Sequence, residues 1–181
     1  MKNDDPGRPQ RSRRPSKSGR PASKPRSCFT PLTVFSLSEQ ETVEFGRTFA
    51  QQLRGGELVL LRGELGVGKT VFARGVAIGL EIDPEEVSSP SYALIHEYRG
   101  GRLDVFHIDL YRLDQPEETE TLGIEDLLDS GGVLLAEWGE RLPAFYRRDA
   151  VLISFHDIGE GSRRIDVMPA EVQHDELISD A

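Results

Sequence analysis

The sequence predicts a three-layer α/β domain built on a mixed sheet that includes an antiparallel hairpin. The first observation is an apolar run at residues 58–61, which is short enough for a buried parallel strand and leads into a glycine-rich turn. The second is a helical apolar pattern that follows this turn to about Leu80. The third is a pair of strand-like runs at residues 92–98 and 103–108, joined by a short linker with two glycines.

The other elements follow from caps and apolar spacing. Ser38 and Glu41 form a capping box, and the pattern after them predicts a helix that ends near residue 53, before two glycines. A further helix is predicted over residues 116–128, because it starts with proline and carries acidic residues in its first turn. Apolar runs predict strands at residues 133–136, 151–155 and 164–167.

Composition divides the 181 residues into a basic extension (1–31), a globular domain (32–170) and a short acidic tail (171–181). The extension has nine basic residues against two acidic ones, six prolines and almost nothing apolar, so we expect it to be disordered. From residue 32 onward, thirteen basic residues face twenty-nine acidic ones, a net charge of −16. We find no secretory signal and no run long enough to span a membrane, and a single cysteine excludes an intramolecular disulfide. A cytoplasmic protein without membrane contact is expected.

The glycine-rich turn, "GELGVGKT" at residues 63–70, matches the phosphate-binding pattern G-x-x-x-x-G-K-[ST] in full. Its glycines let backbone N–H groups approach phosphate oxygens, and the following helix adds a partial positive charge. The lysine is expected to reach the β- and γ-phosphates, and the threonine hydroxyl to bind Mg²⁺. The domain is therefore predicted to be of the P-loop NTPase type, with nucleotide contacts from Gly63, Gly66, Val67, Gly68, Lys69, Thr70 and Val71.

A second metal contact is expected from a carboxylate at the end of a neighbouring buried strand. Glu137 ends the uninterrupted run "VLLAE" and is the predicted metal-side residue. Asp109 ends the second strand of the hairpin and is predicted to meet the γ-phosphate or the attacking water. A surface carboxylate without a function is the alternative for each. No N-K-x-D stretch encodes selectivity for guanine, so ATP is favoured.

Four motifs, "GELGVGKT", "SPSY", "HIDLYRL" and "EWGE", occur in this order over residues 36–168 and resemble the TsaE family. That family consists of small bacterial P-loop ATPases required for threonylcarbamoyladenosine synthesis on tRNA. The resemblance implies ATP and Mg²⁺ as ligands, and an assembly with the subunits TsaD and TsaB. In that assembly TsaD transfers the threonylcarbamoyl group to the adenosine next to the anticodon. The small ATPase supports repeated turnover and meets tRNA only through the complex.

The resemblance also implies a role for single residues. Lys69 and Asp109 correspond to the phosphate-binding lysine and to the aspartate implicated in hydrolysis, and they are the predicted catalytic residues. Thr70 and Glu137 correspond to the metal-binding pair, with Trp138 near the nucleotide.

Two positions depart from the family pattern, and a third cannot be assigned from it. Ser91 of the switch-like "SPSY" loop is predicted to bind nucleotide, although threonine is usual there. Val71 stands where a second hydroxyl residue is common. The family also uses an arginine of the C-terminal strands near the nucleotide, and either Arg163 or Arg164 matches it.

Other interpretations remain open. P-loop kinases use the same phosphate cradle, so a small-molecule phosphotransferase is an alternative, although no insertion for a lid or an acceptor is evident. An RNA-binding module led by the basic extension is another, although the acidic domain would repel RNA. For Trp138 and His107, packing in the core competes with a role in the site.

Overall fold

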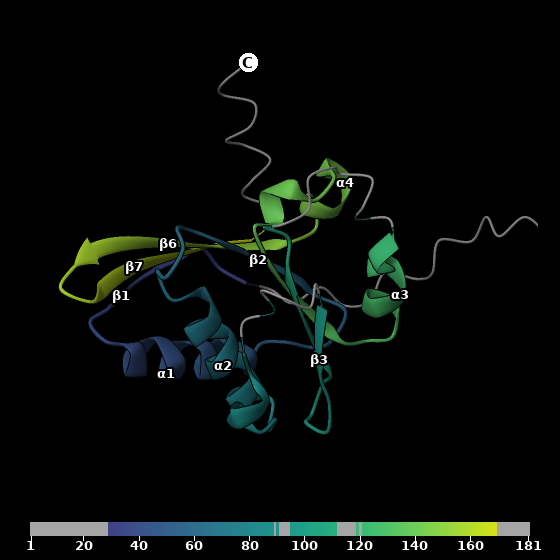
Figure 1. The fold of residues 1–181 in the computed structure, drawn as a ribbon, viewed down its shortest axis with the longest axis horizontal. Coiled ribbons are helices and arrows are strands. Elements are labelled where there is room, and N and C mark those ends of the chain that lie inside the picture. Colours follow the sequence, from purple (N-terminus) through teal and green to yellow (C-terminus); the bar gives the residue numbers. More distant parts are fainter. Residues whose placement is uncertain (1–28, 89, 91–94, 112–118, 120, 170–181) are drawn as a thin grey trace, which may run out of the picture.

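The computed structural model describes residues 29–88, 90, 95–111, 119 and 121–169. Its strands form one mixed sheet in the order β1-β7-β6-β2-β5-β4-β3 (Figure 1). Neighbouring strands pair in parallel from β6 through β2 and β5 to β4, and antiparallel at both ends of the sheet. The strands are β1 (Leu32–Ser36), β2 (Leu58–Arg62), β3 (Ile95–Tyr98), β4 (Val105–Asp109), β5 (Val133–Glu137), β6 (Val151–Gly159) and β7 (Ser162–Met168).

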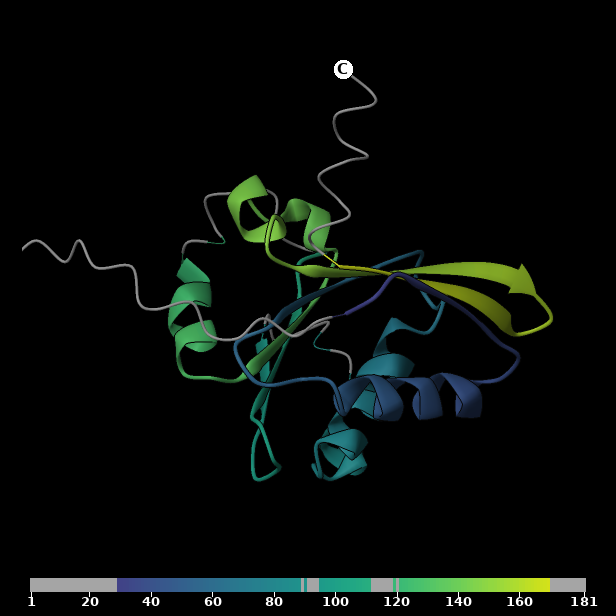
Figure 2. The ribbon, with the colours of Figure 1, turned by 180° about the vertical axis from the view of Figure 1, so that it is seen from behind.

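Helical segments cover both faces of this sheet, as predicted for a three-layer domain (Figures 1 and 2). On one face, α1 (Glu39–Ala50) and α2 (Lys69–Gly79) pack on the core together with Val59 and Leu61 of β2. On the other face, Leu58 and Leu60 of the same strand contact a second cluster. That cluster includes residues of α3 (Ile124–Asp129) and α4 (Ala144–Arg147). Both sides of the central strand are therefore buried, as its apolar run predicted.

Side-chain hydrogen bonds stabilise both ends of α1. The capping box predicted from the sequence forms at its start, and Arg102, in the linker between β3 and β4, binds its end. Ser38 Oγ accepts a hydrogen bond from the backbone of Glu41, 3.2 Å away. The Glu41 carboxylate in turn accepts one from the Leu37 backbone N–H at 2.7 Å. At the other end, the Arg102 guanidinium donates to the carbonyls of Ala50 and Leu53. Terminal groups that the helix itself leaves unpaired are satisfied at both ends.

The two helices beneath the sheet approach each other closely through glycines. A Cβ placed on Gly75 of α2 would lie 2.2 Å from the Val43 carbonyl oxygen of α1. One placed on Gly46 of α1 would lie 2.4 Å from the Phe72 carbonyl oxygen of α2. Because neither position has room for a side chain, these glycines set the distance between α1 and α2, and α2 carries the glycine-rich turn at its start.

Five parts of the fold differ from the sequence-based expectation or extend it. The predicted helix at residues 116–128 is wrong in its start, because α3 begins at Ile124, after Gly123 at a φ of 63°. Residues 112–118 and 120 of that range lie outside the described residues. β1 was not predicted, and it pairs with β7. The short segments η1 (Pro84–Glu86), η3 (Gly139–Arg141) and α4 were not predicted either.

The packed part of the chain includes a residue that the sequence assigned to the extension. Phe29 is buried in the core and stacks on Phe49, with ring centroids 4.8 Å apart. Among the described residues, no helix has the length and apolar character needed to cross a bilayer.

Candidate nucleotide-binding site

The glycine-rich turn joins the central strand β2 to helix α2. Gly63, Gly66 and Gly68 adopt φ values of 145°, 80° and 113°, which residues with a side chain rarely adopt. Gly68 is the N-cap of α2 and offers no side chain to the helix, and the first turn contains no acidic residue. The N-terminal N–H groups of α2 therefore remain available to an anion, as in other phosphate-binding turns.

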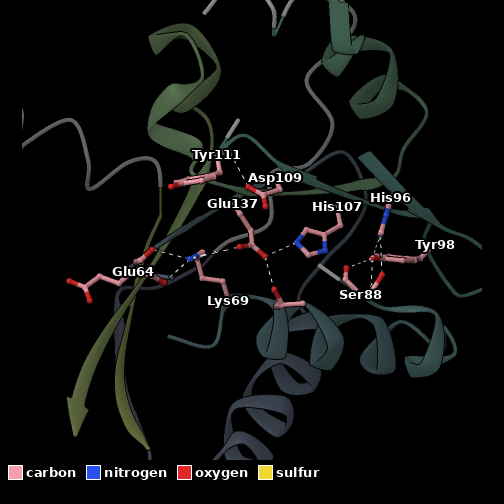
Figure 3. A network of polar contacts seen from close by, with 11 residues as sticks. Glu64, Lys69, Ser88, His96, Tyr98, His107, Asp109, Tyr111 and Glu137 are labelled. Carbon is pink, nitrogen blue, oxygen red and sulfur yellow. Dashed lines mark hydrogen bonds and ion pairs between the residues drawn. The ribbon is translucent and has the colours of Figure 1, made fainter. Parts of the chain in front are cut away.

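Lys69 connects this turn with the neighbouring strand β5 (Figure 3). Its side chain is buried, and Nζ donates to the carbonyls of Gly63 and Glu64, each 2.9 Å away. The same nitrogen lies 3.8 Å from Glu137 Oε2 and 5.0 Å from the centroid of the Trp138 ring. The ammonium group thus lies between the turn and the carboxyl end of β5.

The two predicted carboxylates lie at the ends of adjacent parallel strands. Asp109 on β4 and Glu137 on β5 are direct partners in the sheet register. Glu137 is only 5% exposed, and its Oε1 accepts from Thr70 Oγ1 at 2.9 Å. Asp109 accepts from the backbone N–H of Tyr111 at 3.0 Å and has no described contact with the turn. The structure brings both carboxylates to one edge, with Glu137 in contact with the threonine of the motif.

The surroundings of Glu137 favour its ionised form. Burial raises the pKa of this carboxyl, but a hydrogen bond from His107, electrostatic attraction to His107 and Lys69, and the hydroxyl of Thr70 lower it. The net effect holds the pKa of Glu137 below its usual value. A buried, ionised oxygen ligand next to a hydroxyl suits a hard cation.

These groups surround a cavity of about 310 Å³. Part of its lining comes from the glycine-rich turn with the start of α2, and part from the ends of β4 and β5. The aromatic rings of Tyr111 and Trp138 line it as a pair, with centroids 5.1 Å apart. The lining residues are Leu65, Gly66, Gly68, Lys69, Thr70, Val71, Asp109, Tyr111, Glu137 and Trp138.

Most of the predicted site residues that the structure describes line this cavity, and Gly63 and Val67 have other contacts. Gly63 contributes its carbonyl to Lys69, and Val67 packs against the core on the α1–α2 side. Ser91 lies outside the described residues. Tyr111 was not singled out in the sequence, although an aromatic residue two positions after Asp109 is a signal that could have found it.

The structure distinguishes between the two candidate arginines. Arg163 is 8% exposed and lies against the turn, because a Cβ on Gly68 would be 2.8 Å from its Nη1. Within the described part of the chain it donates to two neutral oxygens, Thr42 Oγ1 at 3.1 Å and the Gly161 carbonyl. Arg164 lies on the opposite face of β7 and pairs with Asp166. Arg163 is therefore the arginine beside the turn, a buried cation with neutral partners there.

The site fits Mg²⁺ held with a nucleotide better than a metal held by protein alone. No group of three or more His, Cys, Asp or Glu side chains that could bind a metal occurs in the described residues. Magnesium sites of nucleotide-binding enzymes usually combine one or two protein oxygens with phosphate oxygens and water. The hydroxyl of Thr70 and the carboxylate of Glu137, 2.9 Å apart, supply such protein oxygens.

The family model described as "Threonylcarbamoyl adenosine biosynthesis protein TsaE" matches residues 36–165. The tRNA threonylcarbamoyladenosine biosynthesis protein TsaE of Treponema pallidum is 38% identical over 132 residues, which cover 73% of this chain and 96% of that protein. The protein of the same name from Nostoc sp. is 35% identical over 153 residues, or 81% of this chain and 91% of that one.

A solved structure agrees with these sequence matches. The crystal structure of YdiB from Bacillus subtilis superimposes with a TM-score of 0.63 at 26% sequence identity. The match covers 83% of this chain and 93% of that one. With the family model matching well over half of its length, the chain belongs to the TsaE family of threonylcarbamoyl adenosine biosynthesis proteins.

Proposed function

We propose that this chain is a Mg²⁺-dependent ATPase that serves as an accessory subunit in the synthesis of threonylcarbamoyladenosine on tRNA. The proposal rests on two contacts of the Glu137 carboxylate at the end of β5. It forms an ion pair with Lys69 and accepts a hydrogen bond from Thr70. A lysine, a hydroxyl and an ionised carboxylate at one point are the groups that P-loop ATPases use to bind phosphate and metal.

The phosphates would be held from two sides of the turn. On one side, the free N–H groups at the start of α2 and the Lys69 ammonium supply positive charge. On the other side, the Arg163 guanidinium lies beside Gly68 and has only neutral partners among the described contacts. A polyphosphate would provide the anionic partner that this buried cation does not find among the described residues.

Thr70 and Glu137 are the residues that would hold Mg²⁺. When bound, the metal would neutralise charge on the phosphate oxygens. Asp109 lines the same cavity next to Glu137, and its one described hydrogen bond is with the backbone of Tyr111. Its carboxylate is therefore the group proposed to orient the attacking water, and Ser91 is proposed as a further nucleotide contact.

The proposed partners follow from the family. Relatives carry the name tRNA threonylcarbamoyladenosine biosynthesis protein, and the resemblance implies assembly with TsaD and TsaB in the cytoplasm. The chain would then contact tRNA through the complex and would not perform the transfer itself. Hydrolysis by the isolated chain is expected to be weak and to rise when both partners are present.

Two measurements test this proposal. ATP hydrolysis is followed with the chain alone and with both partner subunits, and phosphate transfer to small-molecule acceptors is followed in parallel. Faster release of inorganic phosphate with the partners supports the proposal, whereas transfer to an acceptor would favour the phosphotransferase alternative.

In a strain lacking the gene, tRNA should lose threonylcarbamoyladenosine, and a Lys69→Ala copy should not restore it. Normal modification in that strain would contradict the proposal.

A further inference from the structure

His107 lies on β4, two residues before Asp109, and its side chain is completely buried. Its Nε2 lies 3.0 Å from Glu137 Oε1 (Figure 3). The other ring nitrogen, Nδ1, is also buried and has no hydrogen-bond partner among the described residues. A buried polar atom without a hydrogen-bond partner is unfavourable, and an apolar side chain would fill this space without creating one. Packing alone therefore does not explain a histidine at this position.

The chemistry of the partner assigns the hydrogen in this contact. An ionised carboxylate only accepts hydrogen bonds, so the contact with Glu137 requires that Nε2 carries the hydrogen. The ring is supported from its other side by Tyr98, whose ring centroid lies 6.4 Å away. Tyr98 is in turn fixed, because its hydroxyl donates to the Ser88 carbonyl at 2.9 Å. The imidazole is thus held in one orientation, with its Nε2 directed at Glu137.

Two donors from different elements converge on one oxygen of this carboxylate. Thr70 Oγ1 approaches Glu137 Oε1 from α2 at 2.9 Å, and His107 Nε2 approaches the same oxygen from β4 at 3.0 Å. The second oxygen, Oε2, lies 3.8 Å from Lys69 Nζ. A carboxylate held in this way cannot rotate without breaking a buried hydrogen bond.

We propose that His107 is a positioning residue, which fixes the Glu137 carboxylate so that Oε2 faces the metal–nucleotide complex. This inference rests on the proposed function. Removing the Nε2 donor would leave Thr70 as the one described hydrogen-bond donor to the carboxylate, which could then rotate. The loss should affect binding of the metal, because Lys69 and the N–H groups of α2 would contact phosphate without help from His107.

A pair of substitutions separates the donor from the volume of the side chain. In His107→Gln, the amide nitrogen can occupy the place of Nε2, whereas in His107→Asn the shorter side chain reaches only the place of Nδ1. Trp138 is the sole tryptophan of the chain and lines the cavity, so its fluorescence reports on binding there. We would measure the affinity for a non-hydrolysable ATP analogue with saturating Mg²⁺ and with EDTA, and take the ratio of the two.

In the Asn variant, the enhancement of affinity by Mg²⁺ should fall about tenfold, the lower range for groups that orient metal ligands. In the Gln variant it should stay within about threefold of the wild type, and affinity in EDTA should be unchanged in both. An Asn variant with the full enhancement, or equal losses in both variants, would overturn the inference. A wild-type chain that binds no nucleotide would contradict the proposed function itself, and with it this inference.

A measurement on the wild type covers the case in which the variants do not fold. Nitrogen-15 NMR of the histidine rings distinguishes the two neutral tautomers, and the chain has four histidines to assign. A signal for His107 with hydrogen on Nε2 supports the inference. A signal with hydrogen only on Nδ1 would overturn it, because Nε2 could not then donate to Glu137.

Discussion

Lys69 is the only lysine after residue 24, and its surroundings explain why arginine does not replace it. Its Nζ is buried and lies within 2.9 Å of two carbonyl oxygens of the turn. A compact ammonium group can satisfy its donors there and still face the Glu137 carboxylate. A planar guanidinium has five donors in a fixed geometry and cannot reproduce these contacts of a compact ammonium group.

Lys69→Arg is therefore expected to behave like Lys69→Ala despite its conserved charge. In both variants ATP hydrolysis in the presence of the partner subunits should fall about 100-fold or more, the loss typical of removing a donor to transition-state charge. Phosphate release at saturating ATP measures the effect. Arg74→Ala is the matched control, since this residue is exposed on the same helix and outside the cavity. Wild-type rates in Lys69→Arg would contradict the role assigned to the ammonium group.

The lowered pKa of Glu137 predicts how stability changes with pH. In the folded state this pKa lies below the usual value of 4.5, so in acid the unfolded chain binds a proton more readily at this group. The ionised carboxylate therefore stabilises the fold above about pH 4.5, and its contribution disappears as the pH falls through the folded-state pKa. Glu137→Gln should be less stable than the wild type at neutral pH, and the difference should shrink in this acidic range.

Denaturant unfolding at a series of pH values, without nucleotide or metal, measures this difference directly. Subtracting the two curves removes the background of other carboxylates. A difference that stays constant from pH 7 to pH 3 would mean that the charge of Glu137 contributes nothing to the free energy of unfolding.

At the scale of elements, those that the sequence predicted are the ones with strong local signals. The capping box defines the start of α1, and the apolar run of β2 next to the glycine turn defines the central strand. β1 escaped prediction because it is a mostly exposed edge strand, and its pairing partner β7 lies far away in the sequence. The start of α3 was misplaced because Gly123, in a left-handed conformation, directly precedes Ile124, whereas proline and acidic residues suggested a continuous helix through this position.

The close contact of α1 and α2 predicts a cost for a single methyl group. Gly75→Ala should raise the intrinsic helix propensity of α2 by about 1 kcal/mol. The new Cβ would nevertheless meet the Val43 carbonyl at 2.2 Å, so a net loss of about 1–3 kcal/mol is expected from overpacking. Denaturant unfolding measures the change, with Gln40→Ala on the exposed surface of α1 as the control. A Gly75→Ala variant as stable as the wild type would show that the helices can separate freely.

At the scale of the whole molecule, the arrangement of the parallel strands determines which site residues could be predicted from the sequence. Because parallel strands end at one edge, Asp109 and Glu137 could be placed together before the structure was known. Arg163 could not be chosen over its neighbour, since that choice depends on which face of β7 meets the turn. The contact of His107 with Glu137 could not be foreseen either, because it depends on the register of β4 with β5.

The boundary of the folded domain gives the last prediction, through a pair of truncations. Removing residues 1–28 takes away a segment with almost nothing apolar and should leave the melting temperature unchanged. Removing residues 1–31 also deletes Phe29, which is 7% exposed and stacked on Phe49. Loss of this buried ring should cost about 2 kcal/mol, a drop in melting temperature of roughly 5–8 °C.

Phe29→Ala in the full chain should reproduce most of that drop, which separates the ring from the length of the extension. Calorimetry or thermal circular dichroism measures all three proteins under one condition. Equal melting temperatures for the two truncations would mean that Phe29 adds nothing to the core. A drop already present after removal of residues 1–28 would show instead that the basic extension contacts the acidic domain, whose net charge of −16 opposes its own of +7.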